Sequence, residues 1–140
     1  MAIFQKRVDA ILEKIISHNN FTGKYKFFVF RSPNTQVLHA QNRNIYIPSG
    51  LVEVAKNDDQ LAFMLNHEIA HWENLDIRGN KVPKYRSPGQ ISEAECLADK
   101  KAIEATTVAQ YKKQEIDALL QSIKRNRPIC EYDEVATSQQ

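Results

Sequence analysis

The residues best suited to chemistry are two histidines and a glutamate in one short segment, His67-Glu68-Ile69-Ala70-His71. Histidines four residues apart lie on the same face of a helix, so their imidazole nitrogens can bind one metal ion. Glu68 projects about 100° around the helix from His67, where it can reach a water near that ion without being a ligand itself. This is the H-E-x-x-H arrangement of zinc hydrolases, in which the glutamate is the general base.

The helix that carries this segment is predicted to begin after Asn57. Asn57 is a preferred N-cap residue, Gln60 follows at the capping-box position, and Asp58 and Asp59 suit the positive end of the helix dipole. Apolar side chains recur along the rest of the helix, at Leu61, Ala62, Met64, Leu65, Ile69 and Trp72. We therefore expect both histidines in the second half of a largely buried helix.

The elements before this helix are predicted to be one helix and three strands. Residues 2–18 have apolar side chains at helical spacing, and their mixed charges favour packing against a sheet over lying on a membrane. Residues 24–31, 36–40 and 44–48 are typical of short strands in an antiparallel meander, with a short helix at 51–56 after them. The sequence therefore predicts an α+β fold, with a small three-stranded antiparallel sheet packed with about four helices.

The chain after the motif is predicted to be a loop, two helices and a tail. Residues 76–90 contain glycine, proline and basic residues, and we expect them to form a flap over the cleft. Helix is expected to resume near Ile91, with Ser92 as its cap, and a further helix to run from about Thr107 to Lys124. Residues 127–140 are polar and are predicted to be a loose tail, so the domain is expected to span residues 1–126.

Length and composition narrow the class of protein. A chain of 140 residues suits one domain, and a net charge of +2 with scattered basic pairs favours a solvated surface over a nucleic-acid partner. No apolar run approaches the roughly 18 residues of a membrane span, and charges interrupt the N-terminal segment, so we expect a soluble, cytoplasmic protein. The two cysteines, Cys96 and Cys130, are expected to be free thiols.

A catalytic zinc ion takes three protein ligands and keeps one position open for water, so a third ligand is expected outside the motif. Cys96, His18 and His39 have suitable side chains, but none stands in a helical pattern beside the site. Glu95 and Asp99 are better candidates, because they are four residues apart on one helix face. One carboxylate would bind the metal while the other orients a ligand histidine. Alone, these charges would suit a solvated helix face; the H-E-x-x-H segment favours a metal role.

The segment HEIAH followed by Glu95-Cys96-Leu97-Ala98-Asp99 resembles the gluzincin zinc metallopeptidases of the HtpX and CAAX-prenyl-endopeptidase group. Residues 44–71 are also similar to that family's strand, glycine-leucine turn, helix and active-site helix, and the resemblance covers residues 37–105. HtpX-type members carry transmembrane helices that are not seen in this chain, so it looks more like the small soluble minigluzincins. That family often has an asparagine before an alanine upstream of the site, where this chain has His39-Ala40.

The resemblance implies a zincin-like fold with the H-E-x-x-H segment on its active-site helix, and a zinc-dependent endopeptidase acting on peptides or proteins. It implies one catalytic Zn²⁺ bound by His67, His71 and Glu95. It also implies that Glu68 is the general base that acts on a metal-activated water, and that Asp99 supports a ligand histidine.

Peptide hydrolysis makes two further demands on the chain. An extended substrate would align along a strand edge, for which residues 37–40 and 44–47 are both candidates. An electrophile must also stabilise the oxyanion, and the candidates are His39, Tyr85, Arg86 and Tyr111.

Three alternatives differ from an active peptidase of this type. The chain could be a zinc-binding regulatory module, although Glu68 argues against this because a structural site closes its fourth position and needs no base. It could be a latent zymogen, blocked when residues 128–133 place Cys130 or an acidic side chain at the open zinc position. A DNA-associated protease would need a basic stripe and usually a third histidine, and no histidine follows His71.

Overall fold

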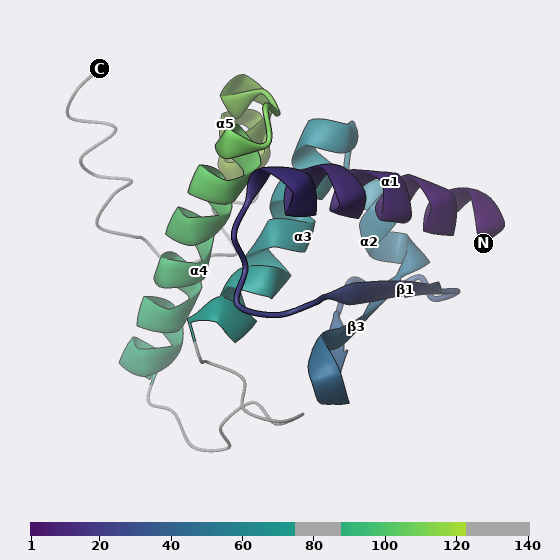
Figure 1. Cartoon of the computed structure of the whole chain (residues 1–140), viewed down its shortest axis with the longest axis horizontal. Coiled ribbons are helices and arrows are strands. Elements are labelled where there is room, and N and C mark those ends of the chain that lie inside the picture. Colours follow the sequence, from purple (N-terminus) through teal and green to yellow (C-terminus); the bar gives the residue numbers. More distant parts are fainter. Residues whose placement is uncertain (75–87, 123–140) are drawn as a thin grey trace.

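The structure, a computed structural model, describes residues 1–74 and 88–122, with only the backbone described for residues 88–92. Five α-helices and three strands form this part of the chain (Figure 1), so the predicted α+β class is confirmed with one helix more than the predicted four or so. In chain order they are α1 (Ala2–His18), β1 (Lys26–Phe30), β2 (Leu38–Ala40), a 3₁₀ turn η1 (Gln41–Arg43), β3 (Asn44–Pro48), α2 (Ser49–Val54), α3 (Asp58–Glu73), α4 (Pro88–Val108) and α5 (Lys113–Ser122).

The sheet is mixed, so the predicted all-antiparallel meander is wrong. The strand order is β1-β3-β2. β2 pairs with β3 antiparallel, as predicted, whereas β1 pairs with β3 parallel, in a register that runs from Lys26 opposite Asn44 to Phe30 opposite Pro48. β3 is therefore the central strand, and β2 lies on its far side from β1.

The connection after β1 explains the parallel pairing. Ser32 does not begin a hairpin turn; its carbonyl accepts hydrogen bonds from the backbone N–H of Gly50 (2.8 Å) and the hydroxyl of Ser49 (3.1 Å). These bonds hold the end of β1 beside the end of β3, and the chain then crosses to the far side to form β2. The crossing needs glycine at position 50, because a Cβ there would collide with the carbonyl oxygens of Pro33 and Asn34.

The main core lies between α1, the sheet and α3. As predicted, α1 packs its apolar face against the sheet, and Figure 1 shows it lying above β1. Gln5 of α1 also donates a hydrogen bond to the carbonyl of Phe27 (2.8 Å) and accepts one from the N–H of Val29 (2.8 Å). The outer edge of β1 is therefore occupied by α1. The buried side chains of this core include Val8, Ile11, Leu12, Ile15, Phe27, Ile45, Ile47, Val52, Leu61 and Leu65.

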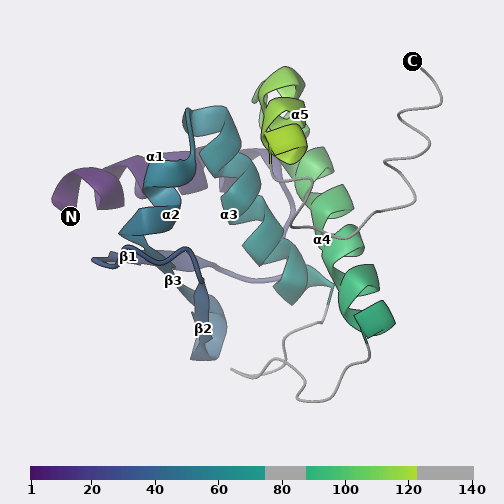
Figure 2. The ribbon, with the colours of Figure 1, turned by 180° about the vertical axis from the view of Figure 1, so that it is seen from behind.

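Helix α3 begins as predicted. The side chain of Asn57 accepts a hydrogen bond from the N–H of Gln60 (3.0 Å), and Gln60 reaches back to the N–H of Lys56 (3.1 Å) instead of that of the cap residue. Figure 2 shows α3 between the sheet on one side and α4 and α5 on the other. Residues 67–71 therefore lie on a helix with neighbours on both sides.

Helix α4 packs closely on α3 because its buried face is made of small side chains, namely Ala94, Ala98, Ala102 and Ala105. Between the helices, the buried side chain of Asn66 donates a hydrogen bond to the hydroxyl of Thr106 (2.8 Å). The predicted boundary of the last two helices is wrong. α4 continues to Val108, and α5 begins only at Lys113, after a turn in which Gln110 has a φ of 69°.

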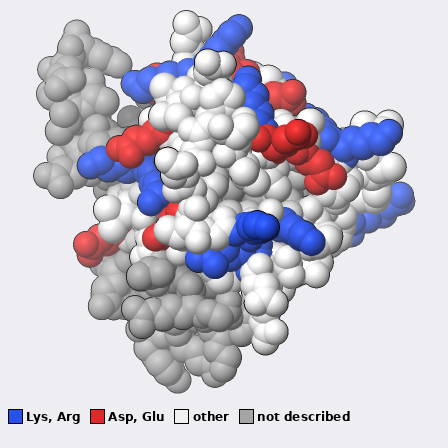
Figure 3. Space-filling view, viewed as in Figure 1, with Lys and Arg blue, Asp and Glu red and all other residues white. Residues whose placement is uncertain are grey.

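Several other predictions concern the ends of elements and the surface. Helix resumes at Pro88 instead of near Ile91, and the remainder of the predicted flap and the predicted tail at 127–140 lie outside the described residues. Within residues 1–74 and 88–122, every helix is too short or too polar to span a bilayer. On the face shown in Figure 3, basic and acidic side chains are interspersed.

Candidate metal centre

The two histidines of the H-E-x-x-H segment place their Nε2 atoms 3.1 Å apart on α3. Their rings meet edge to face, with centroids 4.7 Å apart. Both side chains are largely buried, with exposed fractions of 17% for His67 and 12% for His71. Two imidazole nitrogens on adjacent turns of one helix thus converge on a single point, as the spacing predicts.

Glu95 reaches the same point from α4. Its two carboxylate oxygens lie 3.0 Å from Nε2 of His67 and 3.1 Å from Nε2 of His71. One possible ligand atom from each of the three residues lies within 4.8 Å of the others. Ligand atoms of a tetrahedral zinc ion at 2.0–2.1 Å are separated from one another by roughly 3.4 Å, so the size and chemistry of this donor set fit zinc.

Asp99, one turn after Glu95, orients His67 from behind. Its Oδ1 lies 2.7 Å from Nδ1 of His67, and its side chain is 8% exposed. A carboxylate only accepts hydrogen bonds, so Nδ1 carries a proton and the opposite nitrogen, Nε2, faces the donor cluster. Burial opposes protonation of His67, but the hydrogen bonds with Asp99 and Glu95 outweigh it and raise the pKa of His67 to about 10.

The pKa values of Glu95 and His71 are shifted by their contacts within the donor cluster. Burial raises the pKa of the Glu95 carboxyl, but hydrogen bonds with His67 and His71 outweigh burial and hold that pKa far below its ordinary value. The pKa of His71 is raised, because its hydrogen bond with Glu95 outweighs the opposing effect of burial. Metal ligation requires the same ionised carboxylate, so Glu95 is already in its binding form at neutral pH.

Glu68 lies beside the donor cluster and faces β2. Its Oε2 lies 2.8 Å from Nε2 of His39, and its side chain is 18% exposed. Burial raises the pKa of Glu68, but the hydrogen bond with His39 and the nearby imidazoles of His67 and His71 outweigh burial and lower it. A lowered pKa keeps the carboxylate ionised at neutral pH, as a general base requires.

Trp72 is a contributor to this group that we did not expect from the sequence, where it counted only as an apolar core residue. Its indole Nε1 donates a hydrogen bond to Nδ1 of His39 (2.9 Å). The available signal was its spacing, because Trp72 follows Glu68 by four residues and shares its helix face.

Two of the remaining candidates, Tyr111 and His18, lie away from the donor cluster. The ammonium of Lys14 lies 4.1 Å from the ring centroid of Tyr111. Burial raises the pKa of Tyr111, and the carboxylates of Asp58 and Asp59 at the other end of α3 raise it further. His18 ends α1, with Nδ1 2.9 Å from the carbonyl of Lys14. Tyr85 and Arg86 lie outside the described residues.

Cys96 follows Glu95 on α4 and is disulfide-bonded, so the expectation of a free thiol is wrong for this residue. Cys130 lies outside the described residues. A bonded sulfur does not supply a thiolate ligand, which removes Cys96 from the possible third ligands.

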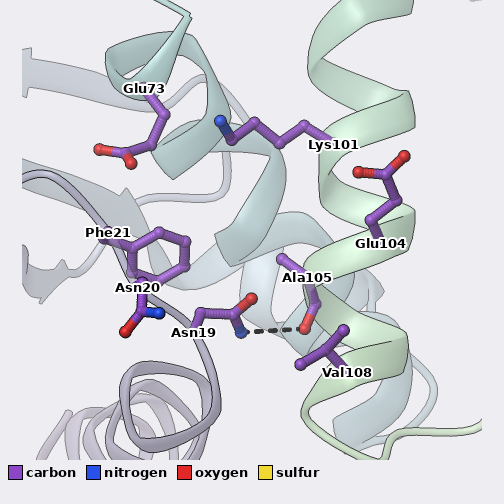
Figure 4. A pocket seen from close by; sticks show the side chains of 8 residues that line it. All are labelled: Asn19, Asn20, Phe21, Glu73, Lys101, Glu104, Ala105 and Val108. Atoms are coloured by element: carbon purple, nitrogen blue, oxygen red, sulfur yellow. Dashed lines mark hydrogen bonds between the residues drawn. The ribbon is translucent and has the colours of Figure 1, made fainter.

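A pocket of about 210 Å³ lies where the chain after α1 meets the end of α3 and the C-terminal part of α4 (Figure 4). Glu73 lines this pocket. It accepts hydrogen bonds from the backbone N–H of Thr22 (2.9 Å), from the Thr22 hydroxyl (2.6 Å) and from the hydroxyl of Tyr25. The pocket contains none of the candidate ligands, and these bonds give Glu73 a structural role in joining α3 to the segment before β1.

Residues 3–88 match the sequence model described as peptidase family M48. The match includes the H-E-x-x-H segment and ends before Glu95 and Asp99. No curated protein sequence matches the chain significantly. The grouping of Glu95 with the two histidines therefore stands on the geometry of α3 and α4.

Proposed function

Because the chain belongs to peptidase family M48, a family of zinc metallopeptidases, we propose that it is a zinc-dependent endopeptidase. The observation that carries the proposal is the convergence of His67, His71 and Glu95 from two helices on one point. Two imidazoles and one carboxylate are a donor set of catalytic zinc sites, which keep a fourth position open. These three residues would hold the ion, and Asp99 would keep His67 in the tautomer that binds it.

The proposed reaction assigns the proton transfers to Glu68. Zinc held by the three ligands would lower the pKa of a water and polarise the scissile carbonyl. The Glu68 carboxylate accepts the proton of that water during its attack on the carbonyl carbon, and later donates the proton to the leaving amine. Glu68 is suited to both steps because its depressed pKa keeps it ionised before the attack, beside the ligands of the metal.

The sheet topology supports one of the two candidate strand edges for the substrate. β3 is paired on both sides, which excludes residues 44–47, and the outer edge of β1 is occupied by Gln5. β2 is the strand that carries His39, the hydrogen-bond partner of Glu68. We propose that an extended peptide aligns along the outer edge of β2, where backbone hydrogen bonds would present its carbonyl to the metal centre.

The decisive experiment is the substitution Glu68→Gln, which keeps the size of the side chain and removes the base. The variant should keep stoichiometric zinc, and its casein hydrolysis should fall by about 10²–10⁴-fold. The exposed Glu53 on α2 offers a matched control, and Glu53→Gln should be as active as the wild type. Undiminished hydrolysis by zinc-loaded Glu68→Gln would falsify the mechanism.

The same assays separate the alternative functions. Wild-type protein with one zinc ion and no hydrolysis of any peptide would indicate a binding or regulatory module. The latent-zymogen alternative depends on residues 127–140, which lie outside the described residues. It predicts that deletion of that segment raises activity, and unchanged activity would dispose of it.

A further inference from the structure

Three side chains from two elements form a hydrogen-bonded series that ends on Glu68. The indole Nε1 of Trp72 lies 2.9 Å from Nδ1 of His39, and Nε2 of His39 lies 2.8 Å from Oε2 of Glu68. The series is shielded from solvent, with exposed fractions of 5% for Trp72 and 10% for the His39 side chain. Trp72 and Glu68 are one turn apart on α3, and His39 on β2 bridges them.

The chemistry of the indole fixes the protonation of His39. An indole N–H can only donate a hydrogen bond, so Nδ1 of His39 must be the acceptor and carry no proton. The ring proton is therefore on Nε2, which donates it to the Glu68 carboxylate. In a doubly protonated ring, the Nδ1–H of His39 would face the indole N–H of Trp72, and two donors cannot form a hydrogen bond with each other. The geometry thus selects the neutral Nε2–H tautomer of His39 beside the carboxylate.

We propose that His39 is a positioning residue for Glu68, and that Trp72 sets the tautomer that allows His39 to hold the carboxylate. This inference rests on the proposed role of Glu68 as general base. With Oε2 held by His39, the oxygen left to accept a proton from water is Oε1, to which no described residue donates a hydrogen bond. His39 then has no N–H left for an oxyanion, so it is not the electrophile.

The strand that carries His39 is itself held in place. β2 is paired with β3, with His39 opposite Ile45. Directly after β2, Asn42 and Arg43 adopt positive φ angles of 62° and 61°, which non-glycine residues rarely adopt. The guanidinium of Arg43 donates hydrogen bonds to the hydroxyls of Tyr25 and Thr22, both at 3.3 Å. A rigidly held β2 is what a residue that orients a carboxylate on another element requires.

The tautomer is tested directly by long-range ¹H–¹⁵N NMR of the histidine rings, in metal-free and in zinc-loaded protein. The His39 signals, assigned by their loss in His39→Gln, should show the Nε2–H tautomer in both states. Trp72→Phe keeps an aromatic ring and removes the indole donor, so the His39 ring should then show a mixture of tautomers or the imidazolium. The inference would be overturned if His39 were the Nδ1–H tautomer in the wild type. It would also be overturned if the Nε2–H tautomer of His39 were the same in Trp72→Phe as in the wild type.

The positioning role is tested by a series at position 39, with zinc content measured for each variant. His39→Ala should lower kcat by about 10–100-fold, change KM less than about twofold and keep one zinc ion per chain. His39→Gln should recover most of kcat, because an amide can donate to Glu68 and accept from Trp72. The control is His18→Ala, which changes an exposed histidine on α1 and should have wild-type kcat.

The outcomes separate this inference from the proposed function. Unchanged kcat in His39→Ala, together with strong loss in Glu68→Gln, would overturn the positioning role and leave the proposed function intact. Equal loss in His39→Ala and His39→Gln would also contradict it, since both variants would then be merely disrupted. Full activity of zinc-loaded Glu68→Gln would show that Glu68 is not the general base. Both the positioning role of His39 and the proposed function would then fail.

Discussion

Oδ1 of Asp99 lies 2.7 Å from Nδ1 of His67, so a carboxylate of α4 fixes the orientation of an imidazole on α3. Glu95 lies one turn earlier on α4 and meets the opposite nitrogen of the same ring at 3.0 Å. A single face of α4 therefore supplies both the third candidate ligand, Glu95, and the carboxylate of Asp99 that orients His67. The i, i+4 spacing that pairs the histidines on α3 is repeated by the carboxylates on α4.

The first prediction concerns that support. Asp99→Asn keeps the volume of the side chain and removes its charge, so His67 should be a less basic and less firmly oriented ligand. Zinc affinity should fall about 10–100-fold, as measured by competition with a chromogenic chelator. Asp117→Asn, on the exposed face of α5, is the control. Equal affinities of wild type and Asp99→Asn would show that the 2.7 Å contact does not act on the metal site.

The second prediction concerns the ligand set. Glu95→Ala removes the carboxylate that faces both histidines, and two imidazoles alone are too few ligands for a stable site. The purified variant should contain far less than one zinc ion per chain by elemental analysis. Glu93→Ala removes an exposed carboxylate two residues away and should keep full zinc. Stoichiometric zinc in Glu95→Ala would mean that another residue completes the site.

The third prediction concerns the contact that holds α3 against α4. Asn66 is 1% exposed, and its amide donates to the hydroxyl of Thr106, which is fully buried. Thr106→Val keeps the side-chain shape and leaves the buried amide without this partner, which should cost about 1–3 kcal/mol of unfolding free energy. Urea unfolding of metal-free protein measures this loss. Thr107→Val changes the exposed neighbour and should cost less than half as much; equal costs would contradict the argument.

The fourth prediction concerns the pH dependence of stability. Burial raises the pKa of Glu73, but hydrogen bonds from Thr22 and Tyr25 outweigh it, so the folded pKa is below the ordinary value of 4.5. A depressed pKa stabilises the fold above the unfolded-state pKa, and this stabilisation is lost as pH falls through the folded value. Glu73→Gln should therefore be less stable than the wild type near pH 7.

The measurement for Glu73 is urea unfolding of both proteins at several pH values between 7 and 3. The difference in unfolding free energy should be constant down to about pH 5 and shrink below pH 4.5. Other titrating groups are common to both proteins and cancel in the difference. A difference that stays the same at pH 3 would show that the charge of Glu73 is not what stabilises the fold.

The elements that the sequence predicts best are those determined by neighbouring residues. The predicted helix over residues 2–18 and the predicted strand over 44–48 match α1 and β3 at both ends, and the predicted cap at Asn57 is present. The pairing of His67 with His71 belongs to the same class, because one turn of helix separates them whatever the rest of the chain does.

Relations between distant segments needed the tertiary structure. The direction of β1 depends on hydrogen bonds between Ser32 and residues 49–50, which no local pattern contains. The placement of Glu95 and Asp99 depends on alanines that let α4 approach α3 closely. The bridge from Trp72 through His39 to Glu68 depends on which strand lies beside α3. Backbone geometry sets contacts within one turn of helix, whereas packing between elements sets the contacts that complete this site.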